Sequence, residues 1–108
     1  MLWLELHGFA RGDRHSAVAR IRFALTGGGA CITAHQQFSN VSLCIGIEID
    51  GARLPALASE LRAAGVALDA RSEAALAAAA PGEWRGSLQI TFVHDEPDLP
   101  VPPPAVPG

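Results

Sequence analysis

The side chains best suited to bind a ligand stand in the segment GDRHS, at positions 12–16. An apolar repeat of helical spacing follows directly, so the segment is predicted to lead into a helix. The first N–H groups of a helix have no partner inside it, and they attract anions. Asp13 or Ser16 can also cap those N–H groups, which requires no ligand. The segment therefore has two interpretations, an anion-binding loop or a plain helix cap.

Two alternating apolar runs occur in ACITAHQQFSNVSLCIGIEID, at positions 30–50, and they meet at Ser39-Asn40. Alternation with a period of two is typical of strands with one buried face, and these runs predict a hairpin that turns at those two residues. A longer loop is the alternative. In this register the apolar residues of both strands share one face. The expected pairs are Phe38 with Val41, Gln36 with Leu43, Ala34 with Ile45, and Ile32 with Ile47.

The same register brings together side chains that bind metals or act as nucleophiles. His35 and Cys44 would lie opposite each other on the outer face, near Cys31, and His7 or Glu5 would join them if the first strand pairs with the third. Thiolates, imidazoles and carboxylates are zinc and copper ligands, and a Cys–His pair can form a nucleophile and its base. No CxxC or HxxxH spacing supports a metal site, and no orienting group accompanies the pair. We therefore expect no metal, no cofactor and no catalysis.

The remaining patterns supply the elements that hold these residues. Ser72 is predicted to cap a short helix, and the glycines at 27–29 end the first helix as a turn. A phosphate-binding loop would precede a helix rather than follow one. The expected elements, in chain order, are strand 2–7, helix 16–26, the hairpin, helix 52–65, an optional strand 66–69, helix 72–80 and strand 87–94.

This order is β-α-β-β-α-β, with a short extra helix and an optional extra strand. It predicts an α+β fold, a ferredoxin-like sandwich. Because every expected strand has one apolar face, we expect an antiparallel sheet with helices on one face. Either 66–69 or 87–94 can be the fourth strand of the core.

Length and composition limit the classes of function. The 108 residues suffice for one domain, expected over 1–95, followed by a proline-rich tail over 96–108. The net charge is −3, lysine is absent and the arginines are scattered, so we expect no binding of nucleic acid or membrane surfaces. The start MLWLELHGF lacks the basic region of a signal peptide, and the apolar runs are too short to span a membrane. A cytoplasmic protein without a disulfide framework is expected.

Positions 2–69 resemble an ACT domain, the small regulatory module attached to many amino-acid enzymes. The family commonly reads Asp-Arg-Pro-Gly-Leu-Leu, then an Ile and a Leu on the helix, and then Gly-x-Asn-Ile at the second strand. The corresponding residues here are Asp13, Arg14, His15 and Ser16, then Val18, Ile21 and Leu25 along the helix, then Gly29, Cys31 and Ile32. His15 and Ser16 thus replace the proline and the glycine, and Cys31 replaces the asparagine. NVSLCIGIEID and LPALASELRAAGV resemble the third strand and the second helix of the family.

The resemblance implies a non-catalytic regulatory domain that binds an amino-acid-like small molecule at the loop before the first helix, near the interface of a homodimer. The ligand carboxylate would accept hydrogen bonds from the N–H groups of Ser16 and Ala17, and its ammonium would meet Asp13. The residues expected to bind it are Arg11, Gly12, Asp13, Arg14, His15, Ser16, Ala17 and Cys31. A dimer would also cover the edge strands and the mixed outer face of the sheet. The alternative is a protein-interaction or assembly module without a ligand.

Overall fold

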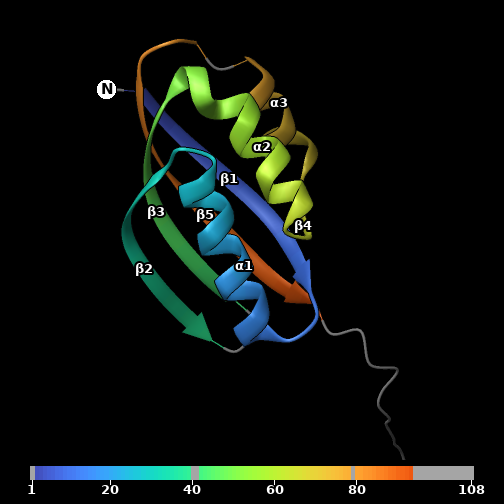
Figure 1. Cartoon of the computed structure of the whole chain (residues 1–108). Helices are drawn as coiled ribbons and strands as arrows, with labels where there is room; N and C mark the ends of the chain where they lie inside the picture. Colours follow the sequence, from blue (N-terminus) through green and yellow to red (C-terminus); the bar gives the residue numbers. More distant parts are fainter. Residues whose placement is uncertain (1, 40–41, 79, 94–108) are drawn as a thin grey trace, which may run out of the picture.

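The computed structural model describes residues 2–39, 42–78 and 80–93, and Figure 1 shows their arrangement. The predicted tail over 96–108, the end of the last predicted strand and the turn residue Asn40 lie outside the described residues. None of the helices in the described part of the chain has the length and apolar character needed to cross a bilayer. The elements are β1 (Leu2–Arg11), α1 (Arg14–Gly27), β2 (Cys31–Ser39), β3 (Ser42–Asp50), a 3-10 turn (Gly51–Arg53), α2 (Leu54–Ala63), β4 (Val66–Leu68), α3 (Ala70–Ala78) and β5 (Glu83–Val93).

The three helices all lie on one face of a five-stranded sheet, so the protein has two layers (Figure 1). The α+β class and the placement of the helices on one face are thereby confirmed. In β1 every second residue is buried, with Leu4, Leu6 and Ala10 facing the helices and Trp3 exposed on the other side. The extra helix and the optional strand of the sequence analysis are present as α3 and β4.

The sheet is mixed, which corrects the prediction of an antiparallel sheet. Its strand order is β2-β3-β5-β1-β4. β5 runs parallel to β1, from the pair Leu2–Trp84 to the pair Arg11–Val93, and antiparallel to β3 on its other side. β5, the last predicted strand, thus separates β3 from β1, and the optional strand β4 pairs with β1 at the edge of the sheet.

β5 lies in the centre of the sheet, and its side chains on the helix-covered face are buried there. Leu88, Ile90 and Phe92 are each at most 5% exposed. Burial of one such side chain contributes about 1.5–3 kcal/mol to folding. Gly86 lies so close to the backbone carbonyl of Leu4 that a Cβ atom would collide with it. A glycine is thus required where β5 approaches β1.

The start of α3 differs from the predicted one, because Asp69 rather than Ser72 caps the helix. Asp69 Oδ1 accepts a hydrogen bond from Ser72 N at 2.8 Å. Hydrogen bonding from the side chain and the backbone of Ser72 lowers the pKa of Asp69 from its usual 3.8. Ser72 itself is buried, and its Oγ accepts a hydrogen bond from His7 N at 2.7 Å. Since β4 ends at Leu68, the Ser72 hydroxyl continues the pairing of β1 beyond the end of that strand.

Candidate functional site

A bulge in β2 decides which of its side chains face the helices. Ile32 pairs with Ile47 as predicted, but the register then shifts by one residue. One extra residue turns every later side chain to the opposite face of the strand. His35 consequently lies opposite Ile45, a buried residue of the helix-covered face, and Gln37 faces the same way. The observed pairs are Ala34 with Gly46, His35 with Ile45, Gln36 with Cys44 and Gln37 with Leu43.

The bulge also separates the residues of the predicted metal or nucleophile cluster. Cys44 stands opposite Gln36 instead of His35, and it lies on the outer face of the sheet. Glu5 and His7 pair with β5 and not with β3, because β5 lies between them and Cys44. Within residues 2–39, 42–78 and 80–93, no three His, Cys, Asp or Glu side chains are grouped as a metal ion would need. The predicted cluster is therefore wrong.

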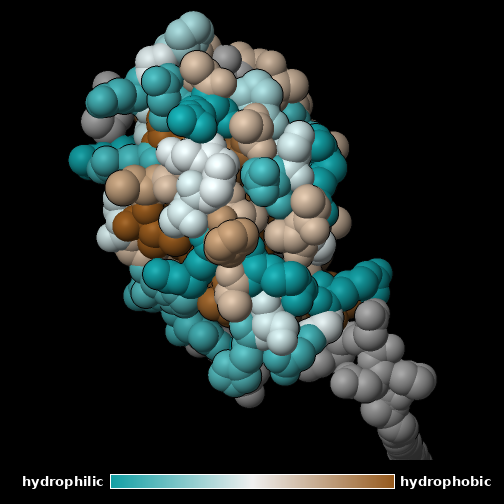
Figure 2. Space-filling model, viewed as in Figure 1, coloured by the Kyte–Doolittle hydropathy of each residue, from teal (hydrophilic) through white to brown (hydrophobic). Residues whose placement is uncertain are grey.

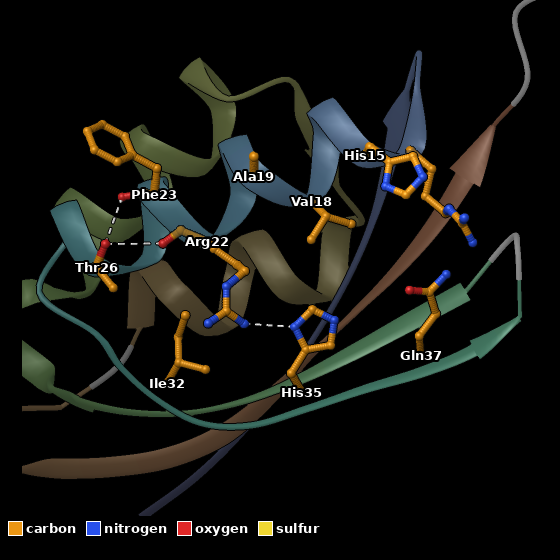
Figure 3. A pocket seen from close by; sticks show the side chains of 10 residues that line it. His15, Val18, Ala19, Arg22, Phe23, Thr26, Ile32, His35 and Gln37 are labelled. Carbon is orange, nitrogen blue, oxygen red and sulfur yellow. Dashed lines mark hydrogen bonds between the residues drawn. The ribbon is translucent and has the colours of Figure 1, made fainter.

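With His35 on the helix side, α1 and β2 flank a groove of about 590 Å³ at the edge of the sheet (Figure 3). The groove is shallow and largely open to solvent. Residues four apart stack on one face of a helix, and α1 presents two such rows to the groove. The rows are Arg14, Val18, Arg22 and Thr26, and His15, Ala19 and Phe23; β2 adds Ile32, His35 and Gln37.

Arg22 and His35 form a hydrogen bond across the middle of this groove (Figure 3). Arg22 Nη1 lies 2.7 Å from His35 Nδ1. A guanidinium group has only N–H donors, so Nδ1 must be the acceptor. The ring proton then lies on Nε2, which gives His35 one further donor. The pair therefore presents N–H groups, not acceptors, to a ligand.

The lining of the groove combines positive charge with apolar surface. Arg14 and Arg22 carry the charge, and among the described residues no Asp or Glu lines the groove. Val18 and Ile32 are partly buried and pack on the core, while Phe23 is 81% exposed. Figure 2 shows hydrophobic surface beside hydrophilic side chains where α1 approaches β2. A molecule with an anionic group and an apolar group matches both properties of the groove.

The predicted binding loop is a helix cap. Asp13 Oδ2 accepts a hydrogen bond from Ser16 N at 3.0 Å, and Asp13 O accepts one from Ala17 N at 2.9 Å. The bond from the Ser16 backbone also lowers the pKa of Asp13 from its usual 3.8. The two N–H groups expected to hold a ligand carboxylate are thus already bonded within the chain. Asp13 thus caps α1, as the capping interpretation predicts, and binding of a ligand at this loop stays a prediction.

The predicted ligand residues do not form one site. Arg14 and His15 line the groove, whereas the other six residues expected to bind the ligand do not. Cys31 begins β2 after the opposite end of α1, which at 1.5 Å per residue lies about 20 Å from the loop. Arg11 ends β1, and Gly12 has a positive φ of 92° in the turn that follows. The loop and Cys31 therefore cannot contact the same small molecule.

Sequence reasoning missed Arg22, Phe23, His35 and Gln37 as groove residues. A signal for the first two was present, since Arg22 and Phe23 lie eight residues after Arg14 and His15 and so share their helix face. For His35 and Gln37 the sequence contains no such signal. The face of the sheet to which their side chains point depends on the bulge in β2, which the sequence does not show.

The chain matches no family model, no curated protein and no solved structure. The resemblance to an ACT domain therefore stays a prediction, and the groove is the structural feature on which a function can be argued.

Proposed function

We propose that this chain is a non-catalytic regulatory domain that binds a small organic anion in the groove between α1 and β2. The observation that carries the proposal is the composition of the groove. Arg14, Arg22, His15 and His35 supply positive charge or N–H donors along it, and no carboxylate of the described part of the chain lines it. An arginine binds a carboxylate through two parallel N–H bonds, the geometry with the greatest strength and specificity. A carboxylate fits this geometry, and we propose it as the anionic group of the ligand.

The apolar part of the ligand would lie against Val18 and Ile32, between α1 and β2, whereas the ring of Phe23 points away from β2 (Figure 3). Covering apolar surface contributes about 25 cal/mol per Å², so an aromatic or branched aliphatic group placed here adds to the affinity. A carboxylate with such a group belongs to the amino-acid-like class that the resemblance implies.

We expect this groove to bind an amine less tightly than a carboxylate. Asp13 is the nearest carboxylate along the chain, and its side chain caps α1 and does not line the groove. The ammonium of a free amino acid would therefore be desolvated there without a charged partner, which costs free energy. An acid that lacks the amine should bind at least as tightly as the amino acid.

Binding would be linked to the contact between α1 and β2. A ligand carboxylate on Arg22 competes with His35 Nδ1 for the same guanidinium. A ligand that binds only one arrangement of the two side chains shifts the population toward that arrangement. We propose that this shift, passed on to whatever contacts α1 or β2, is the regulatory output.

Three matched compounds test the proposal by isothermal titration calorimetry. These are 3-phenylpropanoate, phenylalanine and phenethylamine, which present the acid alone, both groups and the amine alone. We expect the acid to bind at least as tightly as phenylalanine and the amine not to bind. Arg22→Met should weaken binding of the acid about tenfold or more, because a hydrogen bond to a charged group is worth about 1.5–3 kcal/mol. Arg71→Met, on α3 outside the groove, is the matched control and should leave the affinity unchanged.

Two results would contradict the proposal. One is binding of the amine as tight as that of the acid. The other is absence of binding by all three compounds at about 10 mM, a concentration at which even a weak millimolar site is filled.

One observation favours the alternative of an assembly module without a ligand. The face of the sheet opposite the helices has no helix of the described chain packed on it (Figure 1). A chain that binds none of the compounds but associates with itself would belong to that class.

A further inference from the structure

β2 forms one edge of the sheet and is exposed on both of its faces. It stands at the end of the strand order, so no strand of the described chain pairs with its outer side. Residues 33–37 are all exposed, whereas β3 and β5 bury their helix-facing residues. An exposed strand edge is a template for a further strand. We infer that an extended acidic peptide of a partner protein adds to this edge and places its carboxylates on the arginines of α1, an inference that rests on the proposed binding of carboxylates in the groove.

The part of β2 that can pair with a peptide lies between two irregularities of its ladder with β3. The register shifts between Ile32 and Ala34 and again between Gln37 and Ser39. Residues 34–37 between them pair regularly. In a regular antiparallel strand every second residue directs its N–H and C=O groups to the outer side. Extended peptides bind other domains by adding a strand to such an edge, where main-chain hydrogen bonds supply affinity and alternate side chains supply specificity.

The groove beside this edge is longer than one carboxylate group requires. One row of its α1 side chains consists of Arg14, Val18 and Arg22, at intervals of one helical turn. At 1.5 Å per residue, these side chains follow one another at about 6 Å along the helix. Figure 3 shows β2 running alongside α1, with His35 across from Arg22 and Gln37 further along the strand. A ligand that lies along β2 therefore passes all three α1 residues in turn.

The spacing of this α1 row matches the period of an extended chain. Side chains on one face of a strand follow one another at about 6.6 Å, compared with about 6 Å for the row on α1. Three alternate side chains of a peptide can thus meet Arg14, Val18 and Arg22. The flexible stems of the arginines absorb the total difference of about 1 Å. The matching peptide has an acidic residue, an apolar residue two positions later and a second acidic residue two positions after that.

Charge complementarity favours acidic residues at both ends of that pattern. Arg14 and Arg22 are the permanently charged side chains of the groove, and no carboxylate of the described residues lines it. Val18 lies between them in the row and is partly buried against the core, so it offers apolar surface to the middle residue. The groove is open, and the remaining side chains of the peptide stay in solvent. A basic peptide would instead meet two like charges.

Two peptides of identical composition test the inference by isothermal titration calorimetry with the full chain. Acetyl-TETVTET-amide has its acidic residues at the required spacing, and acetyl-TTEVETT-amide has them directly beside the valine. The blocked ends exclude binding through a terminal carboxylate. We expect the first peptide to bind at least about tenfold more tightly, because its carboxylates are about 13 Å apart and can meet both arginines, which are about 12 Å apart along α1.

Arginine variants and methylated peptides locate the binding. Arg14→Met and Arg22→Met should each weaken binding of the first peptide about tenfold or more, whereas the control Arg71→Met on α3 should not. The amides of the valine and of the next threonine point to opposite sides of an extended chain, so only one of them faces β2. N-methylation of that amide should abolish binding, and N-methylation of the other should not. Amide hydrogen exchange at residues 34–37 should also slow when the peptide binds.

Three results would overturn the inference: equal affinity for the two peptides, no binding of either at about 1 mM, or unchanged binding of both N-methylated peptides. These comparisons use the wild-type chain, so they do not depend on the folding of a variant. The small acid 3-phenylpropanoate separates this inference from the proposed function. A chain that binds the acid in the groove but does not distinguish the peptides has the proposed site without the peptide partner. A chain that binds only the first peptide has the peptide partner and not the small ligand.

Discussion

The buried hydroxyl of Ser72 gives the sharpest prediction on stability. Its Oγ accepts a hydrogen bond from His7 N at 2.7 Å and donates one to His7 O at 3.3 Å. Ser72→Ala removes both bonds. His7 O keeps its bond from Asp69 N at 3.0 Å, and Asp69 Oδ1 keeps its bond from Ser72 N at 2.8 Å, so only the N–H donor of His7 loses its partner. An unsatisfied donor in a partly buried position costs about 1–3 kcal/mol.

We therefore expect Ser72→Ala to lower the free energy of unfolding by about 1–3 kcal/mol, and Tm by roughly 5–15 °C for a domain of this size. Urea unfolding followed by circular dichroism measures the first quantity. Ser59→Ala, an exposed serine on α2, is the matched control and should change stability by less than about 0.5 kcal/mol. Amide hydrogen exchange should also become faster at His7.

The reasoning on Ser72 is refuted if the two serine variants are equally stable. It is also refuted if Ser72→Ala is destabilised while the His7 amide stays as protected as in the wild type. In the second case the loss would come from packing and not from the hydrogen bond between α3 and β1.

Two further perturbations follow from the same structure. The pKa values of Asp13 and Asp69 in the folded protein lie below the usual 3.8, so their contribution to stability is complete above that pH and is lost as the pH falls below it. The double variant Asp13→Asn, Asp69→Asn keeps the caps without titrating. Its free energy of unfolding, measured from pH 5 to 2, should therefore fall less steeply with pH than that of the wild type. Gly86→Ala should lower the free energy of unfolding by more than about 3 kcal/mol or prevent folding, because its Cβ would collide with Leu4 O. The control Gly27→Ala meets no atom within 4 Å and should leave the free energy of unfolding in urea nearly unchanged.

The helices and the burial pattern of the strands could be predicted from the sequence because both depend on local periodicity. The sequence has Asp13 before an apolar repeat and glycines at 27–29 after it. These two signals predict the ends of α1 almost as observed. The register of the hairpin could not be predicted beyond Ile32. A bulge between Ile32 and Ala34 turns the later side chains of β2 to the opposite face, and the alternating pattern of the sequence does not show where it occurs.

The central place of β5 was also beyond sequence reasoning. Its alternating residues fit an edge strand and a central strand equally, since both bury one face. What decides is the approach of Gly86 to Leu4, a contact between residues far apart in the chain. The candidate site follows from the bulge, because it turns His35 toward Arg22 and thereby completes the groove.

The most direct test of the central claim is a titration of the ¹⁵N-labelled protein with 3-phenylpropanoate, followed by amide chemical shifts. The account predicts that the largest shifts fall on the two α1 rows around Arg22 and on Ile32 and His35 of β2. It also predicts a change in the ring nitrogen signals of His35, because the ligand competes for Arg22 Nη1. Shifts confined to Asp13–Ala17, to Cys31 or to the outer face of the sheet would contradict it and would place the site elsewhere.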